Sequence, residues 1–163
     1  SKLTVMKKIL IIASAVLMAI GCSPRNITSA YNTPEPIYMN DEADGSITVR
    51  AFGEGRNLYD AKTQARKNAL RAVIFKGISV PGNAYLSRPL VTELNAQEKY
   101  EAFFNEFFKD HGPYEKFVSA WDSRAASDGN SVSSRQARKS ATIRILRSEL
   151  KAYLIENGII KTE

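Results

Sequence analysis

The sequence is poor in the residue types that most often carry out chemistry. Its 163 residues include one cysteine, Cys22, and one histidine, His111. A single cysteine excludes an intramolecular disulfide and a thiolate metal cluster, and a single histidine excludes a metal site built from several imidazoles. The lone histidine, followed by Gly112 and Pro113, is typical of a helix end and disfavours a Ser-His-Asp triad. We therefore predict no metal, no cofactor and no enzymatic activity, and a fold held together by its hydrophobic core.

Long apolar runs are also scarce. The one such run, Ile9–Ile20, is too short to span a bilayer comfortably. It follows Lys7 and Lys8 and ends just before Cys22. A basic start, a short apolar stretch and small residues before a cleavage point are the three zones of a bacterial export signal. Residues 17–21 read LMAIG and resemble the lipobox that lipoprotein signal peptidase cleaves.

We predict that residues 1–21 form a lipoprotein signal peptide, with Met6 as the initiator and residues 1–5 as an upstream artefact. Cys22 then becomes the lipidated N-terminus, and two or three acyl chains at about 0.8 kcal/mol per buried methylene anchor it stably in a membrane. The alternatives are a membrane-retained helix and a core helix, although a run without a polar face fits a core poorly. The expected location is the bacterial outer membrane, facing the periplasm.

The positive charge of the chain is modest. The formal net charge is +6, and removal of residues 1–21 with their three lysines lowers it to +3. This value does not indicate a nucleic-acid partner, and we predict none. The basic side chains gather on the first predicted helix of the domain (Lys62, Arg66, Lys67, Arg71 and Lys76) and around the last predicted strand (Arg135, Arg138, Lys139, Arg144 and Arg147). We interpret them as a solvated surface; the alternative is that Arg138 and Arg144, on one strand face, contact a polyanion or a phospholipid head group.

Hydrophobic periodicity predicts a single α+β domain over residues 45–163, preceded by a lipidated flexible tether over residues 22–44. Strands are expected over residues 47–52, 114–122 and 136–145, and helices over residues 57–76, after Thr92 or Asn95, and over residues 146–156. A surface excursion is expected over residues 79–92 and a hairpin turn over residues 123–134. The order β-α-α-β-β-α predicts a small antiparallel three-stranded sheet with helices packed on one face.

The helix expected after Thr92 or Asn95 has an unusually broad aromatic face. Its members are Phe103, Phe104, Phe107 and Phe108. An aromatic stripe of this kind most often packs in a core, and the alternative is a partly exposed groove for a partner. We therefore name these four phenylalanines, together with Arg138 and Arg144, as candidate partner contacts.

A stretch of the predicted domain resembles a known family. Residues 47–78 read ITVRAFGEGRNLYDAKTQARKNALRAVIFKGI, in which a strand ends in a Gly-x-Gly turn and runs into a helix with alanine about every fourth residue. This pattern resembles the N-terminal domain of flagellar assembly protein T and a related family of small bacterial lipoproteins. The matching positions are Gly53, Gly55, Ala61, Ala65, Ala69 and Ala72. The resemblance implies a non-catalytic envelope module involved in assembly or in surface structures.

Motifs for other chemistry are incomplete. Gly53-Glu54-Gly55 lacks the third glycine of a dinucleotide loop, whose position is taken by Leu58. We predict a non-catalytic envelope lipoprotein, tethered to the membrane at Cys22, that docks an envelope protein partner through its sheet edge or its aromatic insertion. The alternatives are an envelope hydrolase using carboxylates such as Glu54 and Asp122, and a structural protein that contacts peptidoglycan or lipid.

Overall fold

The centre of the fold is a strand and the helix that follows it, β2 (Ile47–Gly55) and α2 (Leu58–Arg71). The computed structural model describes residues 34–121, 131–133 and 136–161, which belong to one compact unit. The signal peptide predicted over residues 1–21, Cys22 and the first part of the predicted tether lie outside the described residues.

The described strands form one antiparallel sheet in the order β1-β2-β5-β3. Besides β2, they are β1 (Ile37–Asp41), β3 (Val118–Trp121), β4 (Ser131–Ser133) and β5 (Gln136–Ile145), and the short β4 pairs with the beginning of β5. In β2 the buried residues Ile47, Val49 and Ala51 alternate with half-buried ones. Val49 lies opposite Ile143 of β5, so the buried positions of both central strands fall on one face.

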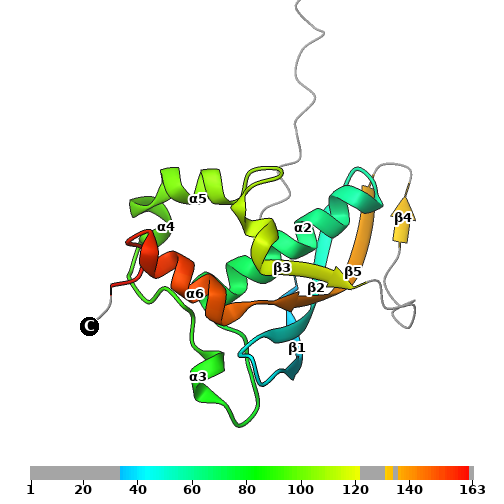
Figure 1. Ribbon diagram of the computed structural model, residues 1–163. Coiled ribbons are helices and arrows are strands. Elements are labelled where there is room, and N and C mark those ends of the chain that lie inside the picture. The colour runs from blue at the N-terminus through cyan, green and yellow to red at the C-terminus, as the bar shows by residue number, and fades with distance from the viewer. Residues whose placement is uncertain (1–33, 122–130, 134–135, 162–163) are drawn as a thin grey trace, which may run out of the picture. The chain divides into compact units, whose positions relative to one another are not determined.

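Helix α2 covers this buried face at very short range (Figure 1). It begins after Asn57, whose side chain caps it by accepting a hydrogen bond of 2.9 Å from the backbone N–H of Asp60. A Cβ atom added at Gly53 would lie 2.0 Å from the backbone oxygen of Ala61. The expected Gly-x-Gly turn after residue 52 is wrong, because Gly53 and Gly55 belong to β2 and pair with β5. Gly53 and the alanine stripe are instead packing features, since only glycine in the strand and small residues in the helix allow this close approach.

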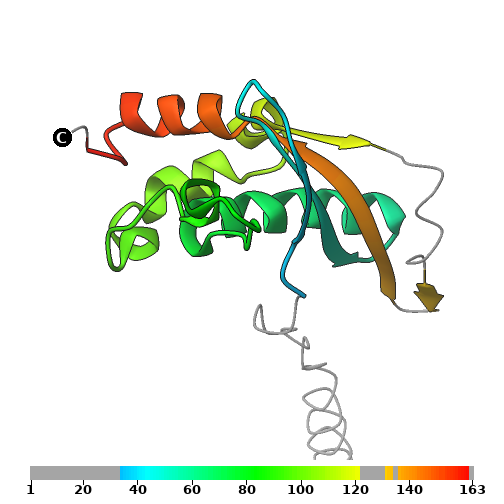
Figure 2. The ribbon, with the colours of Figure 1, turned by 90° about the horizontal axis from the view of Figure 1, so that it is seen from below.

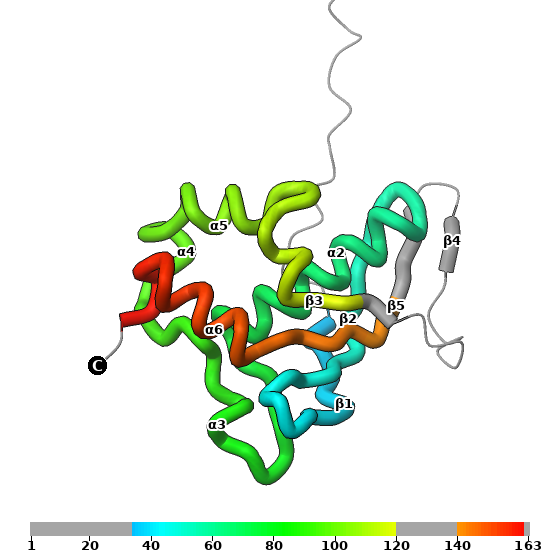
Figure 3. Tube along the Cα trace, in the orientation of Figure 1, coloured from blue at the N-terminus to red at the C-terminus, as the bar shows by residue number. Residues whose placement is uncertain are grey.

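After α2, five helical segments connect β2 to β3, and a further helix follows the last strand, β5. They are the π-helical η2 (Ala72–Lys76), α3 (Ala84–Ser87), α4 (Ala96–Lys99), α5 (Glu101–Phe107), the 3₁₀-helical η3 (Pro113–Phe117) and α6 (Arg147–Glu156). Helices α4, α5 and α6 gather at one end of the sheet, and β4 lies at the other end (Figures 1 and 2). Figure 3 follows the same path along the Cα trace.

The α+β class is confirmed, but the expected number of three strands is wrong. The structure adds β1, which falls inside the predicted tether over residues 22–44, and β4, which falls inside the predicted hairpin turn. Strand β1 pairs with β2 from Ile37 to Asp41, so the folded body begins before residue 45. Most of these five residues are exposed on an edge strand. Their sequence therefore lacks the alternation of apolar and polar residues from which a strand is predicted.

Two further segments differ from their predicted form. Residues 114–122 were expected as one strand, but η3 occupies the first part and only Val118–Trp121 pairs with β5. The expected surface excursion over residues 79–92 contributes to the core through Leu90 and Val91, whose backbone N–H groups donate to Val73 and Ile74 at 3.0 and 2.9 Å. The segment around Pro89 is a loop, as the sequence predicts, but it is not only a surface loop, because its apolar side chains are buried in the core.

Candidate functional site

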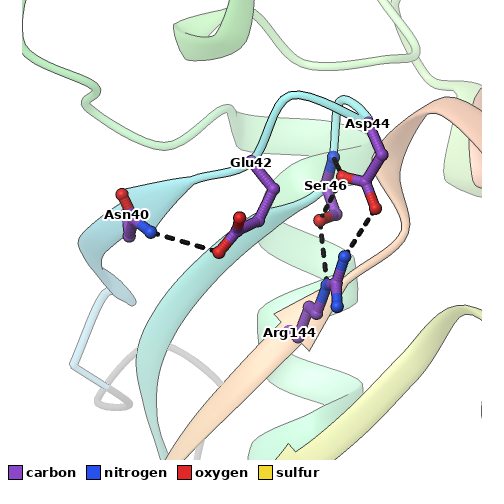
Figure 4. A network of polar contacts seen from close by, with 5 residues as sticks. All are labelled: Asn40, Glu42, Asp44, Ser46 and Arg144. Carbon is purple, nitrogen blue, oxygen red and sulfur yellow. Dashed lines mark hydrogen bonds and ion pairs between the residues drawn. The ribbon is translucent and has the colours of Figure 1, made fainter.

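Arg144, one of the candidate anion contacts, is held by a neighbouring carboxylate (Figure 4). Its Nε donates to the hydroxyl of Ser46 at 2.9 Å, and its Nη2 forms an ion pair with Asp44. The Asp44 carboxylate also accepts from the backbone N–H and the hydroxyl of Ser46, at 2.9 and 2.7 Å. These hydrogen bonds, with the charge of Arg144, lower the pKa of Asp44. Arg144 therefore closes the β1–β2 turn onto β5, and its guanidinium already has an anionic partner.

Arg138, the second candidate on that strand, lies opposite Glu54 of β2 in the register of the sheet. Only its backbone position is described. Arg138 and Arg144 are six residues apart on β5. Their role as a joint contact for a polyanion stays a prediction for Arg138, whereas the ion pair with Asp44 argues against it for Arg144.

The four candidate phenylalanines divide into a buried group and a half-buried member. Phe104, Phe107 and Phe108 are buried, and Phe103 is half-buried against them. The Phe107 ring packs against Phe108, with centroids 4.9 Å apart, and against other rings of the same cluster. Core packing is therefore the main role of this stripe, and a partner could meet only those ring atoms that border the surface.

The surface beside this stripe is hollowed into an open cleft of about 320 Å³. It lies where the end of α2 and η2 face α4 and α5, and each of these elements contributes side chains to it. The lining residues are Arg71, Phe75, Gln97, Glu98, Glu101, Phe104, Asn105 and Phe108. The lining of the cleft thus combines three aromatic rings with five polar or charged side chains.

Arg71 gives the cleft a cation that no carboxylate neutralises directly. Its guanidinium carbon lies 4.5 Å from the centroid of the Phe108 ring, within the range of a cation–π interaction. Among the described residues it forms no ion pair, although Glu98 and Glu101 line the same cleft. The side chain reaches solvent, yet neighbouring protein atoms partly desolvate the guanidinium and lower the pKa of Arg71.

Among the described residues, the side chains considered for catalysis do not come together in one site. His111 is exposed, with its Nδ1 atom 3.7 Å from a carboxylate oxygen of Glu115. Glu54 lies on β2, and Asp122, its suggested partner in a hydrolase, lies outside the described residues. Within the described ranges, no three His, Cys, Asp or Glu side chains are grouped so that they could hold a metal ion.

The buried tyrosine Tyr114 lies in the core and does not line the cleft. Tyr114 is fully buried, and burial raises the pKa of its phenol to about 12. The Nζ atom of Lys67 lies 5.3 Å from the centroid of the Tyr114 ring, and the same ammonium group pairs with Asp110 at 2.9 Å. Lys67, named above among the basic residues of α2, is therefore tied to the protein rather than presented to a partner.

Arg71, Phe104 and Phe108 are notable in the sequence, but no sequence pattern brings them together. Phe75, Gln97 and the two glutamates of the cleft carry no sequence signal that marks them as parts of a site. No family model, curated protein or solved structure matches this chain. In the described part of the chain, no helix has both the length and the apolar character needed to cross a bilayer.

Proposed function

We propose that this chain is a non-catalytic lipoprotein of the bacterial cell envelope that is anchored at Cys22, faces the periplasm from the outer membrane and docks a protein partner. The observation that carries the proposal is the lipobox-like sequence LMAIG directly before Cys22, after a basic start and an apolar run. Residues 23–36 separate Cys22 from β1. At 3.3–3.6 Å per extended residue they span at most about 50 Å, enough to hold the domain near a membrane without embedding it.

The cleft beside α5 is the docking site that we assign to this function. Its aromatic walls suit an apolar side chain, and Arg71 suits an acidic group because it has no carboxylate partner in the described structure. Glu98 and Glu101 would oppose a purely acidic ligand, so the partner segment should carry a basic residue as well. An assembly role also agrees with the resemblance of residues 47–78 to the flagellar assembly protein T domain.

Lipidation is tested by labelling. In cells grown with labelled palmitate, the wild-type chain should incorporate label and fractionate with the envelope, and Cys22→Ala should abolish incorporation completely, because no other cysteine exists to be acylated. A matched variant, Lys116→Met, changes an exposed side chain of the domain and should keep full incorporation. Label that persists in Cys22→Ala, or wild-type protein that never takes up label, contradicts the anchor.

Docking is tested by site-specific crosslinking in intact cells. A photoreactive amino acid at Asn105, in the cleft, should give one discrete adduct, whereas the same group at Glu156, exposed at the end of α6, should not. Arg71→Met should reduce the yield of the Asn105 adduct at least tenfold, because a charge-assisted contact worth about 1.5–3 kcal/mol is removed. Lys76→Met removes an equal charge from an exposed position outside the cleft lining and should leave the yield unchanged. Equal adducts from Asn105 and Glu156 would show that the cleft is not the docking site.

A further inference from the structure

A buried arginine at the start of α6 lacks a counter-ion. Arg147 is only 4% exposed, and its Nη2 donates to two main-chain carbonyl oxygens, those of Tyr85 at 3.2 Å and Arg88 at 3.1 Å. Its Nε is buried without a hydrogen-bond partner, and no carboxylate of the described residues forms an ion pair with the guanidinium. Carbonyl groups satisfy donors but carry no net charge. The positive charge is therefore left uncompensated, which buried charges in proteins rarely are.

A second cation, Lys151, lies one helical turn after Arg147 on α6. Lys151 is half-buried on α6, and its Nζ lies 5.6 Å from the centroid of the Tyr85 ring, while the Arg147 guanidinium carbon lies 4.8 Å from that centroid. Positions four apart on a helix share a face, so α6 presents both charges to Tyr85. Lys151, like Arg147, has no ion pair among the described residues.

Tyr85 brings this positive region to the surface. Its side chain is 60% exposed, on the short helix α3. The neighbouring Arg147 guanidinium, followed by the positive charge of Lys151, lowers the pKa of the Tyr85 phenol, and no carboxylate is among the groups that shift it. The neighbouring charges therefore make the electrostatic potential at the phenol oxygen positive. Because Tyr85 is largely exposed, a ligand in solvent can reach it.

We propose that Tyr85, Arg147 and Lys151 form a binding site for a phosphate group. Two cations and a phenol converge from α3 and α6, and a tetrahedral oxyanion has enough acceptor oxygens to engage all three. A phosphate also supplies the negative charge that the buried guanidinium lacks. A carboxylate has only two oxygens and one charge, so it fits this set less well. The source is either the head group of a phospholipid or free phosphate.

Arg147 differs from two other basic residues that the sequence shows, because those two have carboxylate partners. Arg144 is neutralised by Asp44 and Lys67 by Asp110, so these two charges are already paired. The site also shares no residue with the cleft beside α5 and does not depend on the anchor at Cys22. Failure of either proposal would leave the other standing.

The test is a ligand titration of the full lipidated chain in uncharged detergent micelles. The readout is the ring resonances of ¹³C-labelled Tyr85, assigned with Tyr85→Phe. The three ligands are inorganic phosphate, a short-chain phosphatidylglycerol below its micelle concentration, and sodium chloride at matched ionic strength. We expect saturable shifts with a phosphate-bearing ligand and none with chloride. Saturation by phosphate alone identifies free phosphate as the ligand, and saturation by phosphatidylglycerol identifies a head group.

Variants separate a specific site from general attraction to a basic surface. Lys151→Met, measured on the same Tyr85 resonances, should reduce the affinity for the ligand that saturates the wild-type site at least tenfold. Lys116→Met, which removes an exposed charge from η3, should leave the midpoint unchanged. Arg147 itself is not the first choice because its loss could unfold the loop that it holds. Shifts that do not saturate with either phosphate ligand, or that respond equally to the two lysine variants, overturn the proposal.

Discussion

Replacing Gly53 with alanine is expected to destabilise the domain by about 3 kcal/mol, at the upper end of what overpacking a core usually costs. The added Cβ would lie 2.0 Å from the backbone oxygen of Ala61 and 2.4 Å from the backbone nitrogen of Ala65. Both are main-chain atoms of α2, so no side chain can rotate away to make room. Helix α2 must instead move off β2, which loosens the contact at the centre of the core. Denaturant unfolding followed by far-UV circular dichroism measures the loss.

Gly82→Ala provides the control because it adds the same methyl group where nothing lies within 4 Å. Gly82 has a φ of +75°, so alanine there pays only the backbone cost of a left-handed conformation, about 1 kcal/mol. Gly53 does not have a left-handed φ, and its cost is purely steric. A loss at Gly53 no larger than that at Gly82 would mean that the helix and the strand are further apart than the structure has them.

The elements with strong periodicity were predictable, and the reason lies in their burial. Strand β5 begins and ends where the alternation predicts, and α2 begins at Leu58, at the start of the helix expected over residues 57–76. One face of each is buried and the other is not, so the pattern of apolar residues records the environment directly. Strand β1 could not be found in this way because most of its side chains are exposed and its structure depends on pairing with β2.

The sites were less predictable because they join residues that are distant in the sequence. Arg144 and Asp44 are separated by 100 positions, and no local pattern indicates that the β1–β2 turn neutralises this arginine. Arg147 looks like any other basic residue of the last helix, yet the loop that carries Tyr85 buries it. Composition finds charges, but only the tertiary structure shows which charges are paired.

The second large effect is expected at Phe107, where alanine should cost about 3–5 kcal/mol, a large fraction of the stability of a small domain. Phe107 is 1% exposed and its ring packs among four others. The centroid distances are 4.9 Å to Phe108, 5.9 Å to Phe103, 6.0 Å to Tyr153 and 6.1 Å to Phe117. Truncation leaves a cavity between α5, η3 and α6 that these rigid rings cannot easily fill. Thermal and denaturant unfolding of the purified variant both report the loss.

Phe103→Ala is the matched comparison, since it removes the same atoms from the same helix at a half-buried position. Its expected cost is about 1 kcal/mol, because much of the ring surface remains in contact with water in the folded protein. The ratio between the two variants separates core packing from docking. A Phe107 variant that keeps wild-type stability but loses the Asn105 adduct would mean that this ring serves a partner rather than the core. A Phe103 variant that keeps its stability but loses the adduct would instead extend the docking surface along the half-buried side of α5.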